Sequence, residues 1–360
     1  MLMWVRPAWE SEIALAVYYA IAYLLFDAAT TICSMPYFAL TPELTSDYDE
    51  RTSLTSYRAF FSIAASLVAF IVPLMIIGEF EPQNAGNVLL MGLIFGSVLV
   101  FPLWITFFGT RERQEYMQQK PPKLLQAIKA AAHNKPFVFG AVMYLLTWVC
   151  VDIMQANLLY FIKYVVQQET NSDLIMGSIF VAAMLVLPFW VWASRRWNKR
   201  LAFIAGVGFW AAVQLTISSL SPSTGLEILF ALCILAGIGI SAVHVLPWSI
   251  IPDAIEWDEY HTGERHEGFF YSLISLAQKI ASSIAIPLTL LVLQATGYNA
   301  NLPPGGQPAS AIDGIRFVVG PIPAILLFIS ILFAVLYPLS RQQHQQMVAE
   351  LETRRAAKKP

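Results

Sequence analysis

The chain has 360 residues, of which 57% are hydrophobic and only 13% are charged, and its net charge is −2. Soluble domains average about 45–50% apolar and about 25% charged residues, so this composition excludes a soluble globular or disordered protein. A mean hydropathy of +0.59 indicates a membrane protein instead. No basic stripe alternates with aromatic residues, so nucleic acid is not an expected partner.

Nine apolar stretches are long enough to cross a bilayer, which takes about 20 residues of helix. In chain order they cover residues 13–36, 57–78, 87–109, 137–162, 172–193, 201–220, 227–250, 268–293 and 315–337. Helix is the expected structure because lipid cannot satisfy an open sheet edge, and the alternating strands of a barrel are missing. The predicted fold class is an all-α polytopic membrane protein with about nine transmembrane helices.

The basic residues predict the orientation in the membrane. Most of the 22 Lys and Arg residues lie between alternate spans or in the tail, in segments 111–135, 195–200 and 341–359. Such segments stay in the cytoplasm. We therefore expect a cytoplasmic C-terminus in a bacterial inner membrane, with lipid around the spans and the protein acting as a monomer.

An internal repeat relates the ends of the first and seventh spans. Residues 35–52 and 246–262 each hold two prolines, an acidic residue and an aromatic-Asp-Glu triplet before an aromatic-rich helix. Equivalent elements six spans apart predict two six-helix halves related by a parallel repeat. We expect about three spans of the first half to precede residue 1. The expected domains are a partial N-terminal bundle (1–110), a basic linker (111–135), a six-helix bundle (136–340) and a tail (341–360).

The repeated segments read PELTSDYDERT at residues 42–52 and PDAIEWDEYHTGERHEG at residues 252–268. Both resemble the paired loops of the glycoside–pentoside–hexuronide:cation symporters, the melibiose-permease-like branch of the major facilitator superfamily. The resemblance extends over about residues 13–337. It implies symport of a sugar, glycoside or sugar acid with Na⁺ or H⁺ as the coupling ion, and it implies no cofactor. Some relatives in this family carry other amphiphilic solutes.

Ionisable side chains within spans are costly in lipid and mark candidate sites. Asp27 lies within the first span and Lys279 within the eighth. A lysine there resembles one that the family uses in coupling or substrate binding, and we expect Asp27 or Asp152 to be its partner. His244, in the seventh span, is a candidate proton relay. The alternative for His244 is a core histidine that bonds its neighbours.

Asp152 lies near the middle of the fourth span, with Trp148 before it and Asn157 and Tyr160 after it. An acid, an amide and a phenol suit solute hydroxyls, and Trp148 could stack on a sugar ring. The alternative role for the polar residues is helix–helix hydrogen bonding.

The repeated acidic segments predict a cytoplasmic gate, whose charge pairs form in one state of the transporter and break in the other. The expected gate residues are Asp47, Asp49, Glu50, Arg51, Asp253, Glu256, Asp258, Glu259 and Arg265. Each carboxylate could instead stabilise a helix end.

Two other functions compete with transport. A metal-dependent membrane enzyme could use residues 256–267, which hold Asp258, His261 and His266. That hypothesis is disfavoured because no metal-binding spacing such as His-Glu-x-x-His is present, so we expect no metal site. The other alternative is a membrane protein that does not transport.

Overall fold

The computed structural model describes residues 2–5, 7–9, 11–44, 48–78, 84–110, 124–263 and 267–358. Within these residues all regular structure is helical, and no strand is present. Nine helical segments of this part of the chain are long and apolar enough to cross a membrane. The all-α polytopic class is therefore confirmed. The chain forms two compact units, Met1–Pro121 (unit 1) and Pro122–Pro360 (unit 2).

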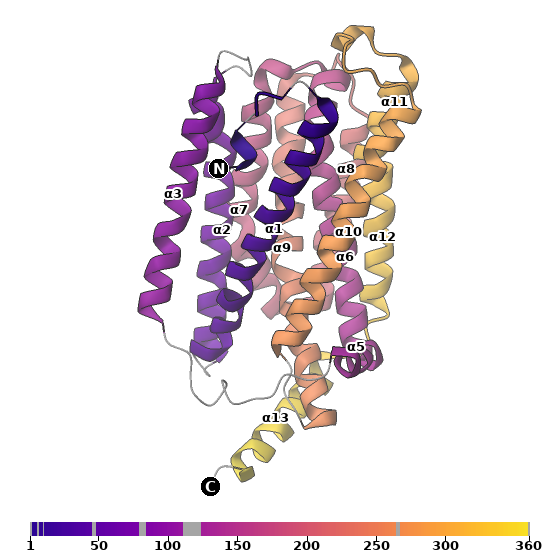
Figure 1. The fold of residues 1–360 in the computed structure, drawn as a ribbon. Helices are drawn as coiled ribbons and strands as arrows, with labels where there is room; N and C mark the ends of the chain where they lie inside the picture. The colour runs from indigo at the N-terminus through magenta and orange to yellow at the C-terminus, as the bar shows by residue number, and fades with distance from the viewer. Residues whose placement is uncertain are drawn as a thin grey trace. The chain divides into compact units, whose positions relative to one another are not determined.

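Unit 1 consists of η1 (Leu2–Trp4), α1 (Glu12–Leu44), α2 (Tyr48–Ile77) and α3 (Ala85–Gly109) (Figure 1). Helices α1 and α3 both pack against α2. Most apolar side chains of this unit point outward, with Ile32, Met75 and Phe107 among the most exposed, as lipid-facing spans require. The first span was predicted to end at Pro36, but α1 continues to Leu44.

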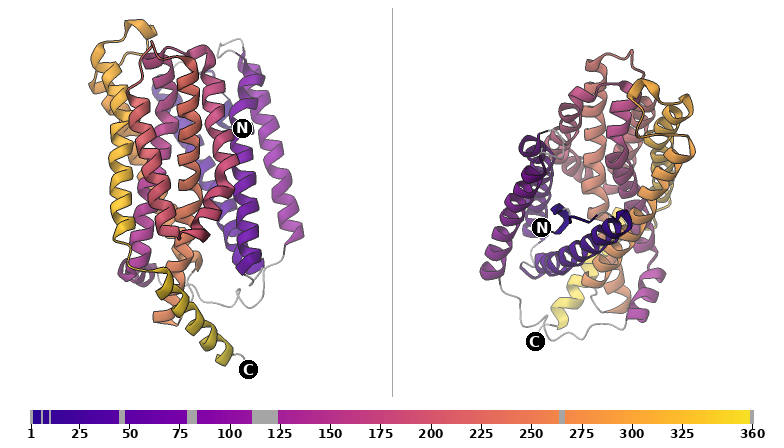
Figure 2. Two further views of the ribbon diagram at one scale, coloured as in Figure 1. Left: turned by 180° about the vertical axis from the view of Figure 1, so that it is seen from behind. Right: turned by 45° about the horizontal axis from the view of Figure 1, so that its top comes forward.

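Unit 2 holds six of the candidate spans. Figure 2 shows its helices from two further sides. Its elements are α5 (Leu124–His133), α6 (Lys135–Tyr160), η3 (Phe161–Val166), η4 (Glu169–Asn171), α7 (Ser172–Arg196), α8 (Lys199–Ser218), α9 (Leu226–Thr262), α10 (Glu267–Ala295), η5 (Pro304–Gly306), α11 (Ala309–Val319), α12 (Pro321–Val335) and α13 (Arg341–Lys358). Helices α11 and α12 together make one span that is broken at Gly320. Pro321 directly follows the break. Proline lacks the N–H that a continuous helix would use in a hydrogen bond, which favours a break at this position.

Helix α9 is the centre of unit 2, since it packs against α6, α7 and α8. The small residues at positions 236, 237, 239 and 241 allow this close approach. A Cβ atom on Gly237 would lie 2.4 Å from the backbone oxygen of Ile179 in α7. A Cβ atom on Gly239 would lie 2.4 Å from the Cβ of Trp210 in α8, and Trp210 is fully buried.

The seventh span is predicted to end at Ile250, but the helix that contains it, α9, continues to Thr262. Helix α9 has 37 residues, about 55 Å at 1.5 Å per residue, whereas the hydrocarbon layer is roughly 30 Å thick. Pro252 does not stop the helix, because Ile251, Ala254 and Ile255 continue its buried face. The helix ends at Gly263, whose φ of 74° is a left-handed conformation that suits glycine. The second acidic segment is therefore helical as far as Thr262.

The linker expected before the second bundle includes α5, which packs against the start of α6. Asn134, between the two helices, is buried and fixes this corner. Its side chain accepts a hydrogen bond from the N–H of Phe137 at 3.0 Å and donates one to the carbonyl of Ala254 at 2.8 Å. Helices α5 and α13 lie at the same end of unit 2 (Figure 1), which we call the basic end. It also carries the turn between α7 and α8, with Arg195 and Arg196.

Candidate functional site

Polar side chains of α6 and α10 face each other along the length of the two helices, and we call this contact the α6–α10 seam. Three hydrogen bonds join the helices: Tyr144 to Gln278 (2.5 Å), Ser282 to Asp152, and Asn157 to Thr289 (3.2 Å). Asp152, Gln278 and Ser282 are half-buried. The seam therefore presents a carboxylate, an amide and a hydroxyl close together within an apolar span.

Asn157 is fully buried, and its Nδ2 also donates to the carbonyl of Ile153 at 2.8 Å. Its Oδ1 accepts no hydrogen bond from the described part of the chain. An unsatisfied buried acceptor costs about 1–3 kcal/mol.

Aromatic rings of α6, α9 and α10 surround the same part of the seam. The Trp148 ring centroid lies 5.6 Å from that of Tyr144 and 5.2 Å from that of His244. Trp248 lies 5.3 Å from Tyr144 and stacks on Tyr271 at 5.9 Å. Aromatic side chains with a few convergent polar groups are typical of small-molecule sites.

His244 Nδ1 lies 3.0 Å from the carbonyl oxygen of Ile240, one turn back on the same helix. This contact agrees with the alternative of a core histidine bonded to its neighbours. The ring nevertheless borders the seam through Trp148, so a relay role stays a prediction.

Tyr160 does not lie with Trp148 and Asp152. Its ring stacks on Tyr164 at 6.3 Å and meets Tyr298 at 5.5 Å, while the Tyr298 hydroxyl donates to that of Tyr164 at 3.1 Å. This tyrosine cluster lies about 12 Å beyond Asp152 along the helix, away from the basic end. Burial raises the pKa of Tyr298, with the neighbouring tyrosines adding to the shift, so its phenol is neutral at physiological pH.

The two other intramembrane charges are placed separately. Lys279 is half-buried on α10, next to Gln278 and three residues before Ser282. Asp27 is half-buried on α1 of unit 1. A pairing between Lys279 and Asp27 or Asp152 stays a prediction.

Gln278, Ser282 and Thr289 on α10 are not among the candidate residues predicted from the sequence. The available signal was their spacing, because residues four and eleven apart fall on one face of a helix. Polar residues on one face of an apolar span indicate contact with another helix or with a solute.

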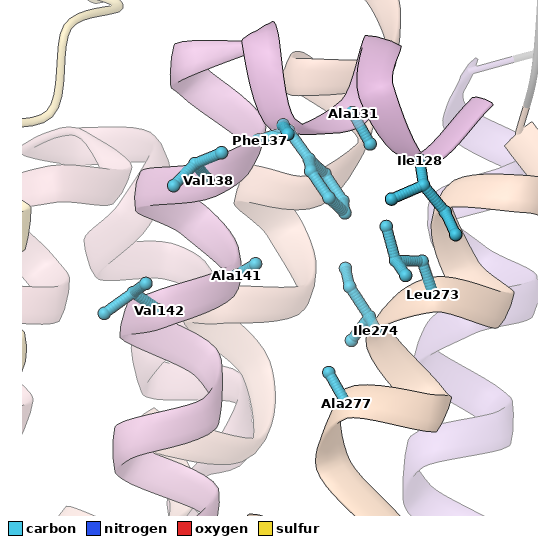
Figure 3. Close-up of a pocket in the computed structure, with 10 residues that line it drawn as sticks. Ile128, Ala131, Phe137, Val138, Ala141, Val142, Leu273, Ile274 and Ala277 are labelled. Atoms are coloured by element: carbon cyan, nitrogen blue, oxygen red, sulfur yellow. The ribbon is translucent and has the colours of Figure 1, made fainter. Parts of the chain in front are cut away.

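An apolar groove lies between α5, α6 and α10 (Figure 3), and α5 places it toward the basic end. It has a volume of about 220 Å³. Its lining comes from α5, α6 and α10: Ile128, Ala131, Ala132, Phe137, Val138, Ala141, Val142, Leu273, Ile274 and Ala277. Figure 3 shows Phe137, Ile274 and Ala277 directed into the space between the helices. Gln278 directly follows Ala277, so the groove adjoins the polar part of the seam.

A charged network occupies the basic end. The Lys199 ammonium donates to both oxygens of Asp253, at 2.7 and 2.8 Å, and to the carbonyl of Ser249 at 2.7 Å. His344 Nε2 lies 2.7 Å from Glu256 Oε2 and 3.6 Å from Asp253 Oδ1. Asp253, Glu256 and His344 are close enough to share a metal ion, but Lys199 already neutralises Asp253 there.

The other expected gate residues are only partly placed. Asp258 is buried on α9, and Glu259 lies beside it on the same helix. Asp47 and Arg265 lie outside the described residues. Asp49, Glu50 and Arg51 lie at the start of α2, and their side chains are outside the described part of the chain.

The residues proposed for a metal-dependent enzyme are not brought together in the part of the chain that the structure describes. His261 is exposed, and its Nδ1 lies 2.8 Å from the carbonyl oxygen of Trp257. Asp258 is buried, and His266 lies outside the described residues. Among the residues that the structure places, the one cluster with metal-binding distances is the Asp253, Glu256 and His344 group.

The candidate membrane spans are those of an integral, multi-pass membrane protein. The family model described as "MFS/sugar transport protein" matches residues 1–341. The chain therefore belongs to the major facilitator superfamily, in its MFS/sugar transport family, as the resemblance implied. Transporters of this superfamily are in general not enzymes.

Several symporters are similar to the chain. The uncharacterized symporter sll1374 of Synechocystis sp. is 28% identical, over 94% of this chain and 77% of the relative. The uncharacterized symporter YjmB of Bacillus subtilis is also 28% identical, with coverages of 93% and 72%. The sodium-dependent lysophosphatidylcholine symporter 1-A of Danio rerio is 24% identical, with coverages of 98% and 71%. These similarities support secondary transport of a small molecule.

Proposed function

We propose that the protein is a cation-coupled symporter that moves an amphiphilic solute by alternating access. One observation carries the choice of solute: the apolar groove adjoins the polar pairs Tyr144–Gln278 and Asp152–Ser282 on the same two helices. Asp152 lies 11 residues after Ala141 of the groove, about 16 Å along the helix. A polar headgroup at Asp152 and an acyl tail in the groove would match this arrangement.

A lysolipid is the amphiphile to test first, since a relative is named as a lysophosphatidylcholine symporter. That name also favours Na⁺ over H⁺ as the coupling ion. The second candidate is a sugar, glycoside or sugar acid. It is favoured by Trp148 beside the polar pairs and by the description of the family.

Purified protein in vesicles distinguishes these candidates. Labelled lysophosphatidylcholine, a neutral sugar and a hexuronate are supplied under an imposed Na⁺ gradient or an imposed proton gradient. Albumin removes lysolipid that has stayed in the outer leaflet. We expect Na⁺-driven entry of the lysolipid. Entry of the sugar or the hexuronate alone would establish the second candidate, and entry of no solute would contradict the proposed function.

Filling the groove should impair transport of a long-tailed solute. In Ala277→Phe the added ring occupies space that would otherwise hold about two methylenes of the tail. This costs roughly 1.5 kcal/mol, or about tenfold in affinity. We expect the KM for a long-chain lysolipid to rise about tenfold and the KM for a short-chain analogue to change little. The matched control is Ile284→Phe, because Ile284 is exposed on the same helix.

If Ala277→Phe changed the KM for long-chain and short-chain solutes equally, the groove would not be the binding site of the tail. Equal effects of Ala277→Phe and Ile284→Phe would show a general loss of folding, which the elution profile of the detergent-purified protein checks independently.

We assign coupling to Lys279, whose charge lies within the apolar part of α10 beside the seam. A cation there responds to the charge of a nearby coupling ion or carboxylate. In Lys279→Gln we expect gradient-driven accumulation to fall at least about tenfold, while exchange of labelled for unlabelled solute continues. Accumulation that survives Lys279→Gln would contradict this role. Lys135→Gln is the control, because Lys135 is exposed at the first turn of α6.

The gate hypothesis also belongs to this function. By the positive-inside rule, the basic end lies on the cytoplasmic side of the plasma membrane. Asp253 and Glu256 would then stand at the inner mouth of the transport path, where the first acidic segment supplies the opposing groups in the closed state. Cysteine cross-linking between residues 49 and 256 tests this: the yield should depend on the presence of solute, and a solute-independent yield would contradict a gate.

A further inference from the structure

Helix α13 is a polar helix that follows the last span and packs against the end of α9. Its sequence, RQQHQQMVAELETRRAAK, has too few apolar residues to enter lipid. Two of them, Met347 and Leu351, are buried at 5% and 4% exposure. The helix is therefore held against the protein by one narrow apolar edge, and its polar contacts decide how firmly it stays there.

The polar contacts of α13 with α9 form two groups, and Arg341 at its start also donates to the carbonyl of Arg195 in α7 at 3.3 Å. Near the start of α13, His344 lies against Glu256 and Asp253. Farther along, Glu350 accepts a hydrogen bond from the Tyr260 hydroxyl at 2.7 Å. Arg354 donates to the Tyr260 carbonyl at 3.2 Å and lies 4.6 Å from the centre of its ring. The second group has no ionisable side chain with an ordinary pKa between 5 and 8, whereas the first group contains a histidine.

Among the residues that the structure describes, charged side chains of two helices face His344. Asp253 and Glu256 face it from α9, and Lys199 faces it from α8 by way of Asp253. The buried phenol of Tyr337 lies near Asp253, and burial together with the Asp253 charge raises its pKa, so it adds no charge. Glu256 is the nearer carboxylate, at 2.7 Å from His344 Nε2 against 3.6 Å for Asp253.

The surroundings of His344 act on its pKa in opposite directions. Partial burial lowers it, whereas the hydrogen bond with Glu256 and the charges of Asp253 and Glu256 raise it, with Lys199 opposing them. The net result is a pKa above the usual value of 6.5. The docked arrangement thus favours the protonated form of His344. An exposed histidine, by contrast, loses its proton just below neutrality.

We propose that His344 is a proton-binding site that fastens α13 to α9. The proton makes His344 a cation between Glu256 and Asp253, and its loss leaves a neutral ring beside two carboxylates. Docking is strongest at a pH below the pKa that His344 has when the helix is released. It weakens as the pH rises through the higher pKa that His344 has when the helix is docked. Each unit of separation between the two values changes the docking equilibrium about tenfold.

The docked helix also engages Glu256, which belongs to the proposed gate. If the proposed function holds, acidification at this side of the membrane should slow transport, because a protonated His344 competes for a gate carboxylate. The docking itself does not depend on the solute or on transport. It can be measured separately.

Cysteine accessibility in the full-length protein tests the docking. The exposed native thiol is removed by Cys33→Ser, while Cys150 and Cys233 are buried. Leu351→Cys reports on the buried edge of α13, and Ala349→Cys reports on its exposed face. The maleimide labelling rate at 351 is divided by that at 349, which cancels the ordinary effect of pH on thiol reactivity. Met347→Cys is a second reporter should Leu351→Cys disturb the helix.

We expect the ratio to be low near pH 5.5 and to rise severalfold by about pH 8. In His344→Gln the ratio should be high and independent of pH, and in His344→Arg it should be low and independent of pH. A ratio that does not change with pH in the parent protein would overturn the proposal. A pH dependence that persists in His344→Gln would also overturn it, because another group would then control docking.

Discussion

Asp152→Asn should abolish most solute uptake while leaving the protein folded. The asparagine keeps an oxygen that can accept the hydrogen bond from Ser282, but it removes the negative charge from the seam. A hydrogen bond to a charged group contributes about 1.5–3 kcal/mol, so the affinity for solute or coupling ion should fall roughly ten- to a hundredfold. Uptake at low solute concentration in vesicles measures this loss.

Two further variants serve as controls for Asp152→Asn. Asp173→Asn removes an exposed carboxylate at the start of α7, and it should transport like the parent. Ser282→Ala keeps the carboxylate and should lose less activity than Asp152→Asn. Near-normal uptake by Asp152→Asn would reduce the Asp152–Ser282 contact to a structural hydrogen bond between helices.

The second large effect concerns packing. Gly237→Ala should destabilise unit 2, because the new Cβ would lie 2.4 Å from the Ile179 carbonyl oxygen and 2.9 Å from the Ala182 Cβ. Backbone of α7 would have to move to make room. Overpacking of this kind costs about 1–3 kcal/mol, or roughly 2–12 °C in the melting temperature of a domain of this size. Thermal unfolding in detergent, followed by tryptophan fluorescence, gives the shift.

Gly177→Ala is the matched control for this substitution. Gly177 is a buried residue within α7, and a Cβ there would meet no atom within 4 Å. Alanine has the higher helix propensity, by about 1 kcal/mol, so Gly177→Ala should leave the melting temperature unchanged or raise it. If both variants melt at the same temperature as the parent, α7 and α9 do not approach as closely as the structure describes.

Much of the fold follows from composition, because about 20 apolar residues in a row leave few alternatives to a membrane helix. The end of α9 did not follow from that rule. The charges of Asp253 and Glu256 and the ring of Pro252 indicated a loop beyond Ile250. The buried face of Ile251, Ala254 and Ile255 outweighs those signals, since tertiary packing stabilises a helix more than local propensity does.

The candidate site was predictable only in part. Asp152 could be singled out because a carboxylate is costly in lipid, whereas its partner Ser282 contributes almost nothing to a hydropathy profile. Which residues of α6 meet which residues of α10 depends on the register between two helices more than 100 residues apart in the chain. The contact of His344 with Glu256 is similarly distant in sequence, and nothing local in either segment indicates it.

Solute-dependent cation entry is the most direct test of cation-coupled symport. Radioactive sodium is supplied outside proteoliposomes, and its entry is measured with and without external lysophosphatidylcholine, with a parallel proton-flux arm. Protein-free vesicles and Asp152→Asn vesicles measure any leak caused by the lipid itself. The predicted result is that the lysolipid accelerates sodium entry only in vesicles with the parent protein. Solute entry without accompanying sodium or proton flux would contradict cation-coupled symport.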